Sequence, residues 1–432
     1  MSDHPVRLVL RDDLRRSRLT VFFRLLLAIP HFFWLAIWSI AVVLSSFVGW
    51  IIALFTAQLP DGLHRFFAAY VRYVVHLGAY LAIAANPYPS FNAQPYPVDM
   101  ELPGPAPQPR WKIAIRLLLA LPALLLAAAL GSGIATGGWS GTRSDTGSEA
   151  EWFASSGIGG VAAICGILGW FAVLAIGRMP LGLRNLGAYG LGYTAQAYAY
   201  TLLLTDRYPN SNPEALGPEW DLPQHPIGLE LADDGRRSRL TVFFRVLLAI
   251  PHFVWLLLWS VAALLAAIGN GLVALFRGRS AEPLHRFLAA YVRYYAHVMA
   301  FVSLVANPFP GFVGAPGYPL DIEIGAPEPQ SRWVTFFRFF LAIPAFLVSA
   351  ALSAALVVAA VLGWFAALAT GRMPTGLRNL GAFCIRYHSQ TNAYWFILTD
   401  AYPHASPALR PPPEPDPEPT YPDPLEPQPE AV

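Results

Sequence analysis

The chain carries four copies of one sequence pattern, and this repetition constrains its fold more than any other feature. Each copy places an arginine six residues before a proline, at the head of a long apolar run. The four pairs are Arg24 and Pro30, Arg116 and Pro122, Arg245 and Pro251, and Arg338 and Pro344. Such internal repetition predicts a fold built from equivalent supersecondary units.

The copies alternate in the order A, B, A′, B′. Pro30 and His64 of the first copy recur at the same spacing as Pro251 and His285 of the third, whereas the second and fourth copies share the tetrapeptide Gly-Arg-Met-Pro. We assign residues 1–90 to repeat A, 91–210 to repeat B with a polar insert at about 131–157, 222–310 to repeat A′ and 316–404 to repeat B′. Residues 405–432 form a proline-rich, acidic tail that we expect to be disordered.

Composition indicates a membrane protein. Hydrophobic residues make up 55% of the chain and charged residues 13%, against about 25% charged in ordinary globular domains. The net charge of +2, spread over every repeat, excludes a concentrated basic face for nucleic acid. We find no catalytic motif and no cofactor signature, so we expect neither an enzyme nor a bound cofactor.

Each repeat opens with apolar residues at every second position, which is typical of a half-buried strand. These segments cover residues 6–10, 98–102, 227–231 and 320–324. Four equivalent strands could pair with one another.

The apolar run that follows predicts a transmembrane helical hairpin. Residues 21–55 are too many for one crossing of about 20 residues. The insert of repeat B interrupts the equivalent run, and a polar loop cannot lie within the hydrocarbon, so it should mark a hairpin tip in water. Arginines at both ends of each run would then lie on the cytoplasmic side. We expect each proline to bend or restart its helix.

A further helix should follow each hairpin, at residues 63–85, 183–205, 284–306 and 377–399. We interpret these as amphipathic helices in the cytoplasmic interface. A third crossing of the membrane is the alternative, favoured by the uncharged residues 186–204. The predicted fold is thus a mainly α, polytopic membrane protein with four repeats, each a short strand, a hairpin and an interfacial helix.

The arginines of the repeat motif are candidate functional residues. Arg24, Arg116, Arg245 and Arg338 lie among apolar residues, where a charge must be paired or reach the head groups. Contact with lipid phosphate is the first interpretation. A buried pair with an acidic residue such as Asp206 or Asp400 is the second.

Matched histidines of the A copies are the other candidates. His31 and His76 recur as His252 and His297, whereas the B copies have alanine and glutamine at these positions. Two such sets could form a proton relay or a metal site. Because no compact metal-binding spacing is present, interfacial histidines without such a role are the simpler interpretation, and no metal site is assigned.

Four short motifs resemble the bacterial membrane family named domain of unknown function 4389. They are Leu-Ala-Ile-Pro-His at 27–31, Leu-Phe-Thr at 54–56, Pro-Thr-Gly-Leu at 374–377 and Leu-Thr-Asp-Ala-Tyr-Pro at 398–403. The resemblance extends over most of the chain as four tandem copies. It implies an integral membrane protein of bacteria, carries no catalytic residues and assigns no activity.

We therefore expect a multi-pass protein of the bacterial inner membrane with cytoplasmic termini. The leading hypothesis is a non-enzymatic scaffold that organises lipids or proteins at the cytoplasmic face, with membrane lipids as partners and a possible protein partner on the tail. A transporter of small solutes or ions, with a pathway between repeats, is the alternative.

Overall fold

The computed structural model describes residues 4–131, 160–216 and 225–407. The predicted insert at about 131–157 and the acidic tail therefore lie almost entirely outside the described residues. Repeat A contains β1 (Arg7–Leu10), α1 (Arg18–Phe22), α2 (Arg24–Thr56) and α3 (Asp61–Leu81). Repeat B contains β2 (Val98–Glu101), α4 (Arg110–Ala114), α5 (Arg116–Leu130), α7 (Val161–Ile176) and α8 (Leu181–Thr201).

The second half repeats this order with fewer breaks. The short helix α9 (Pro213–Leu216) precedes it. Repeat A′ contains β3 (Ile227–Leu231), α10 (Arg239–Arg277) and α11 (Glu282–Val302). Repeat B′ contains β4 (Leu320–Ile324), α12 (Arg332–Thr370) and α13 (Thr375–Trp395).

The predicted hairpin is wrong, because the apolar run forms one continuous helix in three repeats. Helix α2 has 33 residues, and α10 and α12 have 39 residues each. Pro30, Pro251 and Pro344 lie inside these helices and do not end them. No glycine, proline, asparagine or aspartate lies at the centre of these runs. An apolar helix tolerates a proline where its surroundings satisfy the freed backbone group.

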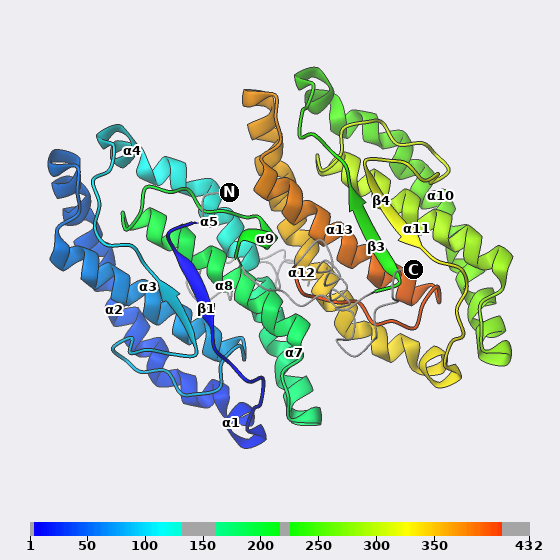
Figure 1. Ribbon diagram of the computed structural model, residues 1–432, viewed down its shortest axis with the longest axis horizontal. Coiled ribbons are helices and arrows are strands. Elements are labelled where there is room, and N and C mark those ends of the chain that lie inside the picture. Colours follow the sequence, from blue (N-terminus) through cyan, green and yellow to red (C-terminus); the bar gives the residue numbers. More distant parts are fainter. Residues whose placement is uncertain (1–3, 132–159, 217–224, 408–432) are drawn as a thin grey trace, which may run out of the picture.

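The insert of repeat B interrupts a helix without reversing it. Gly131 and Gly160 flank the insert, and a Cβ atom built on Gly160 would lie 2.0 Å from the carbonyl oxygen of Gly131. By alignment these glycines match Ser353 and Ala354, which are neighbours within α12. Helices α5 and α7 therefore correspond to the two halves of α12 and follow one another in Figure 1. An insert within an apolar run therefore does not by itself indicate a turn of the chain.

The repeats lie side by side in the spatial order A, B, B′, A′, which differs from their order in the chain (Figure 1). Repeats B and B′ form the centre. Two equivalent hydrogen bonds join them: Asn185 Nδ2 donates to Ser406 Oγ at 2.9 Å, and Asn379 Nδ2 donates to Asn212 Oδ1 at 3.1 Å. The molecule is thus a pseudosymmetric slab with its two A repeats at opposite ends.

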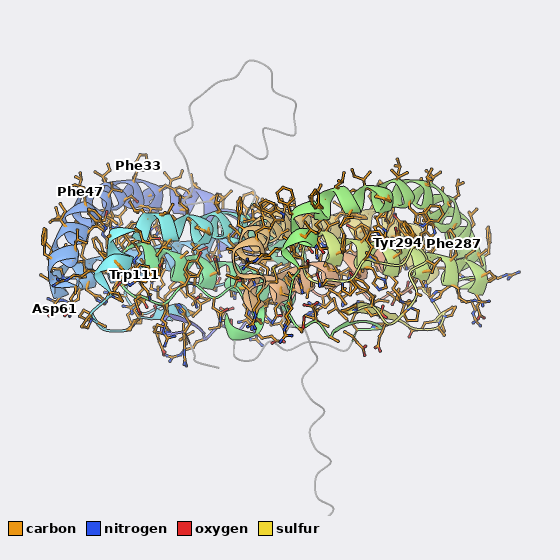
Figure 2. All side chains as sticks on the ribbon, turned by 90° about the horizontal axis from the view of Figure 1, so that it is seen from above. Phe33, Phe47, Asp61, Trp111, Phe287 and Tyr294 are labelled. Carbon is orange, nitrogen blue, oxygen red and sulfur yellow. The ribbon has the colours of Figure 1, made fainter. Side chains whose placement is uncertain are left out.

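The slab has three layers. The long helices α2, α10 and α12, with α5 and α7, form one face, and the 21-residue helices α3, α8, α11 and α13 lie beneath them. The strands cover the other side of the second layer (Figure 1). Figure 2 shows Phe33 and Phe47 of α2 at one edge of the slab, whereas nitrogen and oxygen atoms gather along the opposite edge.

The four predicted strands are present, and they form two sheets. Strand β1 pairs antiparallel with β2, with Leu8 opposite Met100, and β3 pairs antiparallel with β4, with Leu229 opposite Ile322. Each sheet therefore joins an A repeat to the B repeat that follows it. This pairing makes A with B, and A′ with B′, the two structural halves of the molecule.

The expectation of four interfacial helices fails at the centre of the slab. Nearly every residue of α8 from Asn185 to Tyr200, and of α13 from Asn379 to Tyr394, is buried. Their small and aromatic residues pack against neighbouring helices, so these two helices form the protein core. Helices α3 and α11 keep an exposed polar side that includes Arg65 and Arg286.

Candidate functional site: buried arginines and histidine pairs

The repeat arginines cap the ends of the second-layer helices. In repeat A, Arg24 Nη1 donates to the carbonyl oxygens of Tyr80 at 2.6 Å and Ala85 at 3.1 Å. In repeat A′, Arg245 makes the same contacts with Phe301 at 2.6 Å and Ala306 at 3.0 Å. The carbonyls at the end of a helix carry partial negative charge, so a guanidinium neutralises them and adds a charged donor.

Each of these guanidinium groups also lies over an aromatic ring. The distance from the arginine Cζ to the ring centroid is 4.4 Å for Arg24, 4.1 Å for Arg116, 4.5 Å for Arg245 and 4.5 Å for Arg338. The rings belong to Tyr80, Tyr200, Phe301 and Tyr394. Carbonyls on one side and a π face on the other replace the water that the charge loses on burial.

The prediction that these arginines contact lipid phosphate is wrong. All four are between 1% and 3% exposed, and their donors face protein atoms. The acidic-partner hypothesis holds in repeat B′, where Arg338 pairs with Asp400. In repeat B, Asp206 instead lies 3.4 Å from Lys112 Nζ, and Arg116 donates to Thr205 O and to Gln108.

The first pair of candidate histidines is held in aromatic surroundings. His31 Nδ1 lies 2.7 Å from Tyr73 Oη and stacks on Phe91, and His252 Nδ1 lies 2.6 Å from Tyr294 Oη and stacks on Phe312. Both rings are fully buried. Each histidine therefore fastens a long helix to the helix beneath it.

The second pair fastens helices to strands. His76 Nε2 lies 2.9 Å from Asp99 Oδ1, which also lies 3.2 Å from Arg72 Nε. In repeat A′, His297 Nε2 lies 3.1 Å from Asp321 Oδ1, and Arg293 Nε lies 3.4 Å from the same oxygen. Burial lowers the pKa of His76 and His297 from the ordinary value, although the neighbouring carboxylate opposes this shift.

The B repeats perform the same task without an ionisable group. Gln196 Nε2 donates to the carbonyl oxygen of Val6 at 3.0 Å, and Gln390 Nε2 donates to that of Ile227 at 3.2 Å. A histidine or a glutamine at this helix position therefore ties a strand to the second layer in all four repeats. The positions share a structural role despite their different chemistry.

The structure does not bring the candidate histidines together into one site. His31 and His76 have separate partners, and the two A repeats lie at opposite ends of the slab. Within residues 4–131, 160–216 and 225–407, no group of three or more His, Cys, Asp and Glu residues could hold a metal ion.

Sequence reasoning missed a second set of buried arginines. Arg16 Nη2 contacts Asp12 at 2.5 Å, and Arg16 Nε donates to the carbonyl oxygen of Ile83 at 3.2 Å. Arg237 repeats these contacts with Asp233 at 2.7 Å and with Leu304 at 3.1 Å. The sequence did carry a signal for these contacts: two consecutive aspartates begin four residues before each arginine, at Asp12 and at Asp233.

Three tryptophans, each preceded by a glycine, also join repeats. Trp170 Nε1 donates to the carbonyl oxygen of Val21 at 3.0 Å, and Trp50 and Trp364 make the corresponding bonds to Ile113 and Val242. Each bond joins the end of one long helix to the start of the apolar run in the paired repeat. The tryptophans therefore hold A and B repeats together.

A comparison with protein-family models finds one family that matches the chain in four segments. The model described as Domain of unknown function (DUF4389) matches residues 18–93, 151–211, 239–313 and 332–406. The chain belongs to this family. No curated protein matches the chain, and no solved structure matches it.

The DUF4389 segments show what one family unit contains. In repeats A, A′ and B′ the segment holds the long helix, its capping arginine and the second-layer helix, whereas Arg116 of repeat B lies upstream of the matched residues. Asp99 and Asp321 also lie outside the segments. The strand that each A-repeat histidine contacts therefore comes from outside the family unit.

Proposed function

We propose that this DUF4389 protein is a non-enzymatic protein of the bacterial cell membrane that organises lipid, and through it partner proteins, at the cytoplasmic face. The observation that carries the proposal is the exposed apolar surface of the long helices. Three of them, α2, α10 and α12, are long and apolar enough to cross a membrane. Only 17% of the apolar window of α2 and 22% of that of α10 is buried within the protein.

The inward-facing polar groups support a structural role for this protein. The capping arginines bind carbonyls, His31 and His252 bind tyrosines, and His76 and His297 bind aspartates. These contacts hold layers and repeats together. The acidic, proline-rich residues 411–430 would offer a binding segment to a protein partner.

A transporter of small solutes or ions is the second candidate function. It is favoured by the Nε2 atoms of His31 and His252, which are buried without a hydrogen-bond partner, one in each A repeat. Internal repeats related by pseudosymmetry are a feature of many transporter folds.

A flux assay on reconstituted protein separates the two candidates. The full chain is incorporated into vesicles loaded with a pH-sensitive dye, and incorporation is checked by flotation. The scaffold proposal predicts co-flotation and proton flux equal to that of empty vesicles. Flux that disappears in the double variant His31→Gln, His252→Gln but persists in Arg65→Ala, Arg286→Ala would contradict it.

A further inference from the structure

The exposed apolar surface of the long helices is longer than a membrane is thick. On α10 it extends from Leu240, which is 71% exposed, to Phe276, which is 75% exposed. At 1.5 Å per residue this distance is about 54 Å, whereas the hydrocarbon core of a bilayer is about 30 Å thick. A straight crossing would leave nearly half of this surface in water, and even a tilt of about 40° would not cover it.

The polar groups on the outer side of α2 are uncharged serine hydroxyls, which lipid tolerates. Helix α2 has no charged residue between Arg24 and its end at Thr56. Its serine hydroxyls bond within the helix, with Ser45 Oγ donating to Ala41 O at 2.6 Å and Ser46 Oγ to Val43 O at 2.8 Å. Hydroxyl groups that hydrogen-bond to carbonyls of their own helix are suited to a hydrocarbon environment, because they need no water as a partner.

The strand side of the slab is charged and polar, even level with the middle of the long helices. Arg72 lies near the middle of α3, and its side chain is 36% exposed; its partner Asp99 on β2 is 26% exposed. If the helices crossed the membrane, these charges and the open edges of two-stranded sheets would lie at the depth of the hydrocarbon. Both are costly there.

Exposed arginines mark the ends of the long helices. Arg18 Nη2 donates to the last turn of α7 at Ala175 O, and Arg239 Nη2 donates to the last turn of α12 at Ala369 O. Arg178 and Arg372 lie beside them on the surface. Flexible cationic side chains beside exposed phenylalanines are typical of the boundary between acyl chains and phosphates.

From these observations we infer that the protein lies flat in one leaflet, with the layer of long helices submerged parallel to the membrane plane and the strand layer in water. The occupant of the apolar face is the acyl region of a phospholipid leaflet, whose phosphates meet the arginines at the helix ends. The inference rests on the proposed function, since it takes lipid as the partner. It replaces spanning helices by helices that lie within one leaflet, with the edge of the slab that carries Phe33 and Phe47 toward the acyl chains (Figure 2).

Single cysteines along α10 test this orientation. In a background with the buried cysteines replaced, Cys165→Ala and Cys384→Ala, one cysteine is introduced by Ser238→Cys, Leu258→Cys or Glu282→Cys. These positions lie before, within and after α10, and Leu258 is 59% exposed. Sealed vesicles are treated with a membrane-impermeant maleimide, with and without detergent. The matched positions Ser17, Ile37 and Asp61 around α2 provide a second, independent set.

The flat orientation predicts that the two outer positions, Ser238→Cys and Glu282→Cys, react with the maleimide from the same side of the membrane. It also predicts that Leu258→Cys reacts only after detergent is added. Outer positions that label from opposite sides would show a crossing helix and overturn the inference. Labelling of Leu258→Cys from the side opposite to the outer positions would show a hairpin and also overturn it. Recovery of the protein as soluble oligomers would contradict the proposed function itself and indicate that a second copy covers the apolar face.

Discussion

A buried arginine requires fixed dipoles around it, and in this chain the end of a neighbouring helix provides them. Arg24 meets the carbonyls of Tyr80 and Ala85 and the ring of Tyr80. The sequence identified the arginines as candidates but not their partners, because the carbonyls that they cap are backbone atoms about 60 residues away. Of the two acidic residues that the sequence suggested, Asp400 does pair with a repeat arginine, Arg338.

We predict that Arg24→Met destabilises the protein by about 2 to 3 kcal/mol. The methionine fills a similar space, but the carbonyls of Tyr80 and Ala85 lose their charged donor and stay buried. Thermal unfolding in detergent, followed by circular dichroism, measures the effect. Arg65→Met, at an exposed position of α3, is the control and should change stability by less than about 0.5 kcal/mol. Equal effects of the two changes would contradict the capping role.

A pH prediction concerns the histidines beside Arg386. Burial, and secondly the charge of Arg386, lowers the pKa of both His225 and His404 to about 4 from the ordinary 6.5. The unfolded chain therefore takes up protons more readily below pH 6.5. The contribution of the neutral histidines to the free energy of unfolding is fully present above that pH and is lost as the pH falls toward 4.

We expect His404→Asn to reduce this acid sensitivity, because Asn210 occupies the equivalent position in repeat B. Between pH 7 and pH 5, each histidine should lower the free energy of unfolding by about 1 to 2 kcal/mol, allowing for partial solvent screening. Unfolding midpoints at the two pH values measure the change. An unaltered difference in the variant would show that His404 does not titrate in this way.

At the scale of elements, the chain shows that a helix can carry a long insert without turning back. Gly131 and Gly160 remain neighbours although the insert separates them in sequence. The strands were predictable because alternation is a local pattern. Continuity of the apolar helices was not, since a run of 35 residues fits one long helix or two short ones equally well by composition.

Removing the insert should restore an unbroken helix. We predict that deletion of residues 132–159, combined with Gly131→Ala and Gly160→Ala, gives a folded protein with equal or higher thermal stability. Two glycines then become helix-favouring alanines, each worth about 0.5 to 1 kcal/mol. Circular dichroism and the unfolding midpoint report the outcome. A protein that fails to fold, while the same deletion bridged by a flexible glycine linker folds, would show that α5 and α7 are not collinear.

At the scale of the whole molecule, duplication explains the pseudosymmetry but not the spatial order. The sequence showed A, B, A′, B′, whereas the structure places B beside B′ at the centre through Asn185 and Asn379. Contacts between repeats depend on surfaces that meet only after each half has folded. For the same reason the sequence predicted apolar helices in a membrane but not which way they would lie.

The orientation of the long helices relative to the bilayer distinguishes a flat protein from a spanning one. Polarised infrared spectroscopy of the reconstituted protein on a supported bilayer measures it directly. The amide I transition of a helix has its larger component along the helix axis, so its dichroism reports how the axis is tilted. We predict that this dichroism places the average helix axis close to the membrane plane. An average axis within about 40° of the bilayer normal, the range of spanning helices, would show that the long helices cross the membrane and do not lie flat.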